Sequence, residues 1–359
     1  MLPKAETLAP YLRQIDETRL YTNHGPLVET FERRLADWMG FEKKTVLSCG
    51  SGSMALIGAI LALRHRFQRP GNLCLMPTYT FVATAAAAQA CGYQCHLVDV
   101  DRDSWALDPQ VLLQHDRLAD TALVIPVAPY GRPVDFQSWQ AFTNETGIPV
   151  VIDAAACLDW MLTSQVALPA TIPVAVSLHT TKSFGCGEGG LLLVQDPDLI
   201  MDGFRAINFG FLDSREAVIP GLNGRMSEYH AAVGLAELDS FDSKLSKWHS
   251  VAAAYHAAVS QREDTLPGHL WTCPDVSGCY VIYEAASAED ALRAQRRLME
   301  CGIDTRFWYG SGIQAHPAYS HLSTDPLTNT HDLAGRLLGL PCYTDLSATD
   351  IGRIVKALI

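Results

Sequence analysis

One lysine stands in a setting that suggests chemistry. Lys182 follows the apolar segment Val174–Leu178 and lies just before Gly185–Gly190, which holds four glycines in six residues. Lysine is almost never fully buried without a purpose, and a desolvated lysine amine can form a Schiff base with a carbonyl compound. Ser177, five residues earlier, offers a hydroxyl that could accompany a phosphate. A lone lysine in a glycine-rich loop is more often solvated, so this loop alone leaves both interpretations open.

A carboxylate follows another apolar run. Asp153 comes directly after Val150–Ile152, and aspartate is depleted in strands. A partly buried carboxylate needs a cationic or hydrogen-bonding partner, and a protonated pyridine nitrogen would serve. The alternative is that Asp153 caps a following helix.

Small residues join a predicted strand to a predicted helix at Ser51-Gly52-Ser53. A helix N-terminus of this kind exposes backbone N–H groups that suit a phosphate. The segment Gly50–Ala55 also fits G-x-G-x-x-A, but the next strand ends at Thr78 without the acidic residue that a nicotinamide site needs. The alternative is an N-cap by one of the two serines.

A fourth loop, Pro220–Glu228, contains Asn223 and Arg225 in a glycine-rich turn before an alanine-rich helix. Glycine and asparagine mark a turn, and the small residues of the helix allow close packing. A capped core helix with no further role is the alternative.

Short apolar strands that alternate with helices must position these loops. The pattern predicts an α/β fold with a mostly parallel, buried sheet, whose chemistry lies just past the strand carboxyl ends. The predicted strands are Thr45–Ser48, Asn72–Met76, Gln94–Val98, Leu123–Val127, Pro149–Ile152, Val174–Leu178 and Gly190–Val194, with helices over Ser53–Phe67 and Phe81–Ala90.

The pattern changes after Asp239, which predicts a large domain over 1–240 and a smaller C-terminal α/β domain over 241–359. The predicted elements there are a helix over Ser240–Arg262, a strand over Tyr280–Tyr283, a helix over Ala288–Cys301 and a closing helix from Ala348.

Composition excludes several classes of protein. The 359 residues carry 27 basic and 39 acidic side chains, a net charge of −12, which argues against a general nucleic-acid binder. No apolar window reaches the roughly 18 residues of a membrane helix, and the first twenty residues lack the apolar core of a secretory signal. The ten cysteines form no CxxC pair, so we expect free thiols in a reducing cytoplasm and no metal site.

Taken together and in this order, the loops resemble those of the DegT/DnrJ/EryC1/StrS family of pyridoxal-phosphate-dependent nucleotide-sugar aminotransferases, from about residue 20 to residue 357. The matching segments are Thr22–Val28 with Phe31-Glu32, Ser51-Gly52-Ser53, Pro77–Thr84, Ser177–Lys182 with Gly187–Gly190, Gly221–Glu228, Gly302–Arg306 and Leu340-Pro341.

The resemblance implies an aspartate-aminotransferase-like fold (fold type I), pyridoxal 5′-phosphate as cofactor and a homodimer with shared active sites. It implies Lys182 and Asp153 as catalytic residues. The cofactor-binding residues that it implies are Gly52, Ser53, Phe81, Asp153, Ser177, Lys182 and, reaching the neighbouring subunit's phosphate, Asn223.

One departure and one likeness bear on the substrate. Ala156 stands where the family commonly has glutamine or histidine. The run Asp153–Ala156, together with the loop Ser177–Lys182, resembles the branch that aminates dTDP-4-keto-6-deoxy-D-glucose. This resemblance implies L-glutamate as donor and a role in amino-sugar and O-antigen biosynthesis. His179, Arg225 and His316 are candidates for substrate contact, although packing is the simpler role for His179.

Three alternatives remain besides the nicotinamide enzyme. A 3-keto sugar nucleotide is an alternative acceptor for the same chemistry. Related 3-dehydratases carry histidine in place of the lysine, so Lys182 argues against a dehydratase. The third is a non-enzymatic sensor that binds the cofactor.

Overall fold

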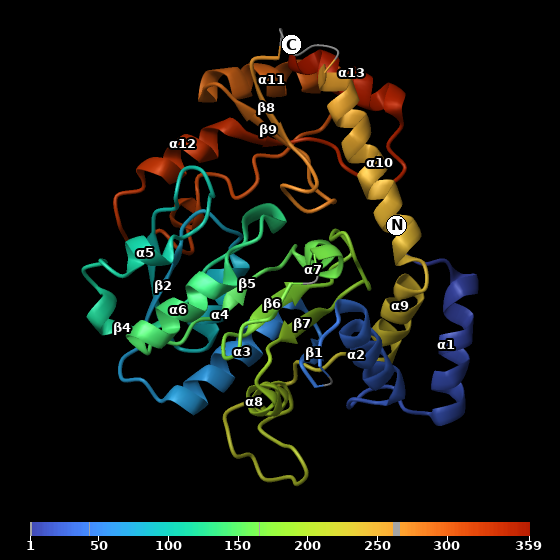
Figure 1. Ribbon diagram of the computed structural model, residues 1–359, viewed down its shortest axis with the longest axis vertical. Coiled ribbons are helices and arrows are strands. Elements are labelled where there is room, and N and C mark those ends of the chain that lie inside the picture. Colours follow the sequence, from blue (N-terminus) through green and yellow to red (C-terminus); the bar gives the residue numbers. More distant parts are fainter. Residues whose placement is uncertain (1, 43, 165, 261–265) are drawn as a thin grey trace.

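A wide β-sheet runs through the larger part of the molecule, and a smaller sheet packs with the C-terminal helices beside it (Figure 1). The computed structural model describes residues 2–42, 44–164, 166–260 and 266–359. The strands associated with the wide sheet are β1 (Val46–Cys49), β2 (Leu73–Pro77), β3 (Gln94–Val98), β4 (Thr121–Val124), β5 (Ile152–Asp153), β6 (Val174–Ser177), β7 (Gly190–Leu193) and β10 (Ser323–Thr324). Those of the smaller sheet are β8 (Gly268–Trp271), β9 (Ile282–Ala285) and β11 (Leu337–Gly339).

Helices cover both sheets. Those of the larger part are α1 (Ala5–Thr18), α2 (Pro26–Met39), α3 (Gly52–Phe67), α4 (Ala83–Ala90), α5 (Pro109–Leu112), α6 (Phe136–Thr146), α7 (Leu158–Ser164), α8 (Pro197–Ile207) and α9 (Glu228–Leu238). They are followed by α10 (Phe241–Ser260), α11 (Ala288–Glu300), α12 (Thr328–Arg336) and α13 (Ala348–Leu358).

Two four-stranded ladders, β1-β7-β6-β5 and β10-β3-β2-β4, meet between β4 and β5. Parallel bridges join Val124 to Val150 and Val127 to Asp153, so the ladders form one continuous sheet. Every neighbouring pair is parallel except those of β7, which is antiparallel to β1 and β6. The predicted α/β fold with a mostly parallel sheet is confirmed. The segment between β6 and β7 contains no helix to carry the chain back, so the chain reverses direction.

Each face of the wide sheet carries its own apolar core. Phe31 of α2, Trp139 of α6 and Leu235 of α9 belong to one cluster, and Ile60 of α3 and Ile207 of α8 belong to the other. Strands covered on both faces read as continuous apolar runs, which is why the sequence places these strands within a few residues.

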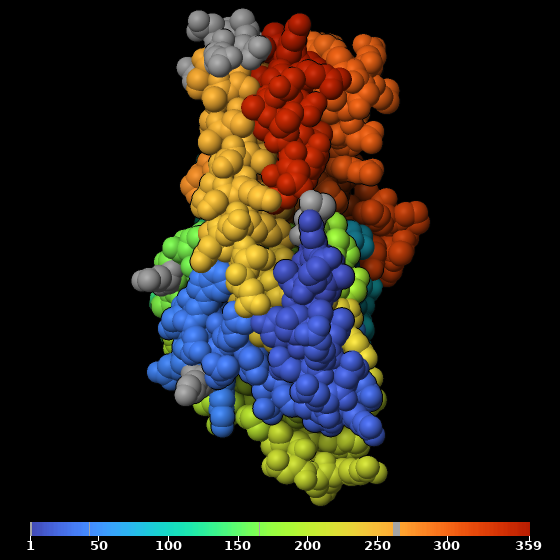
Figure 2. Space-filling model, turned by 90° about the vertical axis from the view of Figure 1, so that its right-hand side faces the viewer, coloured from blue at the N-terminus to red at the C-terminus, as the bar shows by residue number. Residues whose placement is uncertain are grey.

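The C-terminal part has a separate core between its antiparallel sheet and α10, α11 and α13. Helix α10 links the two parts, since Phe241 lies in a core of the wide sheet and Tyr255 lies in the C-terminal core. Figure 2 shows α13 lying beside α10. Among the described residues, no helix is long and apolar enough to cross a membrane.

Two sequence expectations for this part need comment. The strand predicted over Tyr280–Tyr283 begins and ends two residues too early, since β9 covers Ile282–Ala285. A hydrogen bond from the Tyr280 amide to the Ser277 carbonyl (2.9 Å) closes a turn just before the strand. The helix predicted over Ser240–Arg262 begins one residue later, at Phe241, and its last two residues lie outside the described part. The boundary near residue 240 remains a prediction, and β10 joins the edge of the wide sheet from beyond it.

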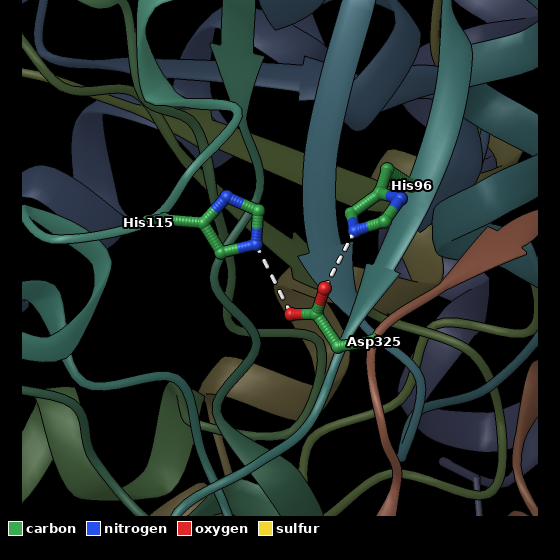
Figure 3. Close-up of side chains that lie close together, drawn as sticks. All are labelled: His96, His115 and Asp325. Atoms are coloured by element: carbon green, nitrogen blue, oxygen red, sulfur yellow. Dashed lines mark hydrogen bonds and ion pairs between the residues drawn. The ribbon is translucent and has the colours of Figure 1, made fainter.

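A clamp of side chains holds β10 against β3 (Figure 3). Asp325 accepts hydrogen bonds from Nε2 of His96 (2.9 Å) and Nε2 of His115 (3.0 Å). Both Nδ1 atoms face N–H groups of Arg117, the guanidinium for His96 and the backbone amide for His115. An arginine only donates, so each imidazole carries its proton on Nε2. A metal ion between these three residues would have to bind the same Nε2 atoms. In the structure these atoms donate to Asp325 instead, so the three side chains form a hydrogen-bonded clamp.

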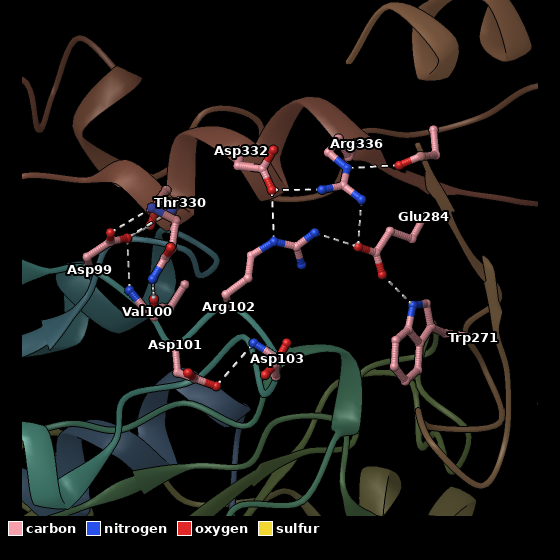
Figure 4. A network of polar contacts seen from close by, with 12 residues as sticks. Asp99, Val100, Asp101, Arg102, Asp103, Trp271, Glu284, Thr330, Asp332 and Arg336 are labelled. Atoms are coloured by element: carbon pink, nitrogen blue, oxygen red, sulfur yellow. Dashed lines mark hydrogen bonds and ion pairs between the residues drawn. The ribbon is translucent and has the colours of Figure 1, made fainter. Parts of the chain in front are cut away.

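A second polar network joins the wide sheet to the C-terminal part (Figure 4). Arg102, in the loop after β3, pairs with Glu284 of β9 and with Asp332 of α12, both at 2.8 Å. Glu284 also accepts from Arg336 (3.2 Å) and from the indole of Trp271 (3.0 Å). Burial acts to raise the pKa of Glu284, but the donors Arg102 and Trp271 hold it below its ordinary value.

We predict that Glu284→Gln destabilises the protein at neutral pH by about 2 kcal/mol, the usual size for hydrogen bonds to a charged group. Because the pKa of Glu284 is lowered by folding, its contribution is present above the ordinary carboxyl pKa and is lost as the pH falls through the lowered value. Urea unfolding at neutral and acidic pH measures the difference.

Glu289→Gln is the matched control, since Glu289 forms an exposed pair with Arg293 on α11 and such pairs contribute little. Equal stability of Glu284→Gln and the wild type at neutral pH would contradict the prediction.

Candidate active site

A pocket of about 420 Å³ opens where the parallel strands end. Its walls come from the loops after β1, β2, β4, β5 and β6 and from the C-terminal part. Sequence analysis predicts polar residues at these carboxyl ends, and the structure brings most of them together. The predicted residues in the walls are Gly52, Ser53, Phe81, Asp153, Ser177, His179 and Lys182.

The N-terminus of α3 forms a cradle at one end of the pocket. The hydroxyl of Ser51 caps the helix by accepting from the Met54 amide (3.2 Å). Ser53, in the first turn of the helix, lines the pocket. A Cβ on Gly52 would lie 2.9 Å from Cβ of Ser177, so only glycine allows this approach. The Ser177 hydroxyl thus lies beside exposed helix N–H groups, a combination that suits a phosphate.

A glycine in β7 allows the N-terminus of α3 to approach that strand as well. A Cβ on Gly190 would lie 2.3 Å from the carbonyl oxygen of Ser51. Two glycines distant in sequence, Gly52 and Gly190, therefore let the α3 N-terminus rest against β6 and β7.

Asp153 ends β5 and lies at the floor of the pocket with 6% of its surface exposed. Its carboxylate accepts hydrogen bonds from the hydroxyl of Thr84 (2.8 Å) and from the Ala155 amide (3.2 Å). Burial raises the pKa of Asp153, against the opposing effects of Thr84 and the charge of Lys182. Neutral donors alone do not balance a buried charge, so this site fits a cationic ligand atom.

Lys182 lies in the loop between β6 and β7 and also lines the pocket. Its backbone amide donates to the His179 carbonyl (2.8 Å), which closes a turn, and its side chain is half-buried. The amine Nζ donates to the hydroxyl of Tyr280 at 3.3 Å. His179 lies at the pocket wall and binds the Thr181 hydroxyl through Nδ1 (2.8 Å).

Phe81 lines the same pocket and is 59% exposed. Its ring is therefore accessible to a molecule that binds in the pocket. Phe81 lines the pocket beside Ala83, where its ring could cover a flat ligand.

Three predicted residues lie outside the pocket walls of this single chain. Asn223 is exposed and accepts from Arg225 (2.9 Å), whose guanidinium also binds Asn208 and lies over the ring of Phe209. His316 is exposed and follows a short 3-10 turn. Neither Arg225 nor His316 faces the pocket as a substrate-contact residue here.

The C-terminal part supplies an aromatic wall that sequence reasoning did not identify. Tyr280, Trp308 and Tyr309 line the pocket together with Tyr130 from the loop after β4. The Tyr309 hydroxyl accepts from the Tyr130 amide (3.2 Å), which fixes the wall to the larger part. The aromatic run after Gly302–Arg306 was the only signal for it in the sequence.

Ala156, where the family commonly has a polar side chain, is buried and lines the pocket. The wall there consists of Ala128, Ala155 and Ala156 with Val127. The side chain of Ala156 therefore offers no hydrogen bond to a ring bound in the pocket.

The walls fit pyridoxal phosphate. The phosphate would lie with Ser53 and Ser177 at the α3 N-terminus, and the ring nitrogen with Asp153. Phe81 would cover the ring, and the amine of Lys182 would meet the carbonyl carbon. Two observations support this fit. The buried Asp153 carboxylate is only partly balanced by a cation, and a Cβ at Gly52 would fill the cradle.

Comparison with known proteins agrees with this geometry. The profile of the DegT/DnrJ/EryC1/StrS aminotransferase family matches residues 4–359. The dTDP-4-amino-4,6-dideoxy-D-glucose transaminase of Shigella dysenteriae is 31% identical over 99% of this chain and 96% of its own length. The UDP-2-acetamido-2-deoxy-3-oxo-D-glucuronate aminotransferase of Pseudomonas aeruginosa is 31% identical over 93% of this chain and 90% of its own length.

The fold has a match among solved structures. A protein from Bacillus cereus assigned as a PLP-dependent aminotransferase superposes with a TM-score of 0.88 at 26% identity, covering 100% of this chain and 97% of the other. The chain therefore belongs to the DegT/DnrJ/EryC1/StrS family of sugar-nucleotide aminotransferases, and it is a PLP-dependent enzyme of fold type I.

Proposed function

We propose that this enzyme transfers the amino group of L-glutamate to dTDP-4-keto-6-deoxy-D-glucose and so forms dTDP-4-amino-4,6-dideoxy-D-glucose, in amino-sugar and O-antigen biosynthesis. The observation that carries the chemistry is the pocket whose walls hold Lys182 and Asp153 together with Ser53 and Ser177. Relatives from Shigella dysenteriae and Escherichia coli that are named for this product support the choice of sugar.

The residues of this chain have separate tasks in the proposal. When bound, pyridoxal phosphate supplies the electron sink for transamination. Asp153 would hold the ring nitrogen in its protonated form, and the Lys182 amine would hold the cofactor and move a proton at the reacting carbon. Tyr280 and Trp308 close the pocket from the C-terminal part, where apolar rings exclude water from the reacting groups.

A second acceptor has specific support. The Pseudomonas aeruginosa relative is named for a 3-oxo sugar and is as similar in identity as the Shigella dysenteriae relative. A 3-keto sugar nucleotide is therefore the alternative acceptor for the same pocket.

The proposal includes a homodimer in the cytoplasm. Several aromatic rings outside the pocket are exposed on the larger part, among them Phe209 and the stacked pair Tyr21 and Tyr229. A second copy that covers these rings would bring its Asn223 to the pocket, as the family resemblance implies. The ten unpaired cysteines favour a reducing compartment.

Lys182→Ala tests the attachment of the cofactor. The variant should lose the visible and near-ultraviolet absorbance that the wild type gains with pyridoxal phosphate, and cyanoborohydride should bleach only the wild type, since only an amine forms the covalent link. Lys247→Ala, at an exposed lysine that pairs with Asp345 at 3.8 Å, is the control. Retention of absorbance and turnover in Lys182→Ala would disprove the assignment.

Asp153→Asn tests the buried charge. Because burial raises the pKa of Asp153, holding its charge costs the cofactor-free wild type stability as the pH rises from the ordinary carboxyl pKa towards the raised value. The neutral amide should make the cofactor-free variant more stable than the cofactor-free wild type near neutral pH, with no gain at low pH. Urea unfolding across this pH range measures the effect.

The same pair of proteins tests the cofactor contact. Added pyridoxal phosphate should raise the melting temperature of the wild type more than that of Asp153→Asn, because only the carboxylate pairs with a ring cation. An equal rise in both proteins would refute the proposed pairing with the ring nitrogen.

A substrate panel tests the choice of sugar. The enzyme is incubated with ¹⁵N-labelled L-glutamate and either the 4-keto or the 3-keto isomer of the dTDP-6-deoxy sugar, and the products are read by mass spectrometry. We expect label in the 4-amino product at a rate at least about tenfold above the 3-amino product, the size of discrimination that one well-placed contact provides. Faster amination of the 3-keto isomer would establish the alternative.

A further inference from the structure

The amine of Lys182 meets a residue from another part of the molecule. Its Nζ donates to the Tyr280 hydroxyl at 3.3 Å and lies 5.8 Å from the centre of the Tyr280 ring. Lys182 belongs to the β6–β7 loop, whereas Tyr280 precedes β9 in the C-terminal part. The contact therefore joins the reacting atom to an element that contributes nothing to the phosphate cradle or to Asp153.

A tyrosine hydroxyl has a property here that a carboxylate lacks. Burial raises the pKa of Tyr280, and nearby Cys279 and Asp159 act in the same direction, so the side chain stays a neutral phenol at working pH. A neutral hydroxyl accepts from an ammonium group and donates to a free amine. A carboxylate would instead favour only the charged form of the lysine. Tyr280 can thus hold the amine in both of its protonation states.

A buried carboxylate fixes the turn that carries Tyr280. Asp159 of α7 accepts from the Gly278 amide (2.7 Å) and from the Ser277 hydroxyl (3.0 Å to Oδ2). The turn closes with the hydrogen bond from the Tyr280 amide to the Ser277 carbonyl (2.9 Å). The Ser277 amide also donates to the Tyr130 carbonyl (2.9 Å).

Asp159 is buried, and burial raises its pKa against the donors from Gly278 and Ser277 that act to lower it. It lies outside the pocket walls and holds neither cradle nor ring. A buried carboxylate is a costly group to keep in a protein core. Its hydrogen bonds to Ser277 and Gly278 indicate that it serves the position of this turn.

We propose that Tyr280 positions the amine of Lys182, and that Asp159 acts as a second positioning residue by clamping the Ser277–Gly278 turn. The inference rests on the assignment of Lys182 proposed above. It makes the docking of the C-terminal part a condition for a correctly aimed amine.

The test is the rate at which Lys182 attaches added pyridoxal phosphate to the cofactor-free protein, followed by the rise in visible absorbance after rapid mixing. Tyr280→Phe removes only the hydroxyl, and we expect attachment to slow about tenfold, the effect of losing one hydrogen bond to a reacting group. Turnover number should fall in parallel, with KM for both substrates within about twofold, because the hydroxyl touches the lysine and not the substrate.

Non-covalent binding of pyridoxal phosphate distinguishes an effect on the position of the Lys182 amine from an effect on affinity for the cofactor. In the Lys182→Ala background, Tyr280→Phe should leave the dissociation constant of pyridoxal phosphate unchanged within about twofold, since the cradle and Asp153 are intact. Tyr255→Phe is the matched control: it removes another buried tyrosine hydroxyl of the C-terminal part, one that donates to the Pro341 carbonyl at 2.7 Å, and it should attach the cofactor at the wild-type rate.

Asp159→Asn keeps the shape but removes a charged acceptor, and attachment should slow in the same direction. It also tests the inference should Tyr280→Phe fail to fold. Attachment at the wild-type rate in Tyr280→Phe, or an equal slowing in Tyr255→Phe, would overturn the role of Tyr280, and a wild-type rate in Asp159→Asn would overturn that of Asp159. Covalent attachment that persists in Lys182→Ala would instead disprove the proposed function itself.

Discussion

The contact of the α3 N-terminus with β6 and β7 is the constraint on which the site depends. Gly52 meets the Ser177 side chain and Gly190 meets the Ser51 backbone, at distances that no Cβ tolerates. This approach sets β1 and β7 side by side and turns the first N–H groups of a sixteen-residue helix towards the Ser177 hydroxyl. The phosphate cradle therefore follows from packing, and any side chain at Gly52 or Gly190 would separate the helix from the sheet.

A second constraint is electrostatic. The protein buries Asp153 with two neutral donors and balances it only in part with Lys182. Such a group is unfavourable in the protein alone and favourable once a cation lies against it. The cost is a form of preorganisation, since the charge need not be moved or stripped of water when the ligand ring arrives.

The sequence predicted the parts of the site that are local and missed those that are not. The strands and loops around Ser53, Asp153 and Lys182 follow from apolar runs, and their meeting follows from the parallel sheet. Tyr280 and Asp159 lie 121 positions apart in the chain, and nothing periodic links them. Strand β10 has only two residues, too few to show the apolar pattern by which a strand is predicted. The bounds predicted for β9 were wrong because the Ser277–Tyr280 turn depends on the Asp159 carboxylate in α7. Local sequence propensity cannot reveal a contact between residues so far apart in the chain.

The division of chemistry between the two parts has a consequence for the acidic protein as a whole. At a net charge of −12, its overall field repels the anionic phosphates of cofactor and sugar nucleotide. Attraction must then come from short-range donors, which in the proposed site are the α3 N–H groups with Ser53 and Ser177. The C-terminal part adds neutral aromatic side chains, among them Tyr280 and Trp308, and no acidic side chain among the residues that line the pocket. It can therefore cover an anionic ligand without adding to the repulsion, and the contribution that we propose for it is to position the amine of Lys182.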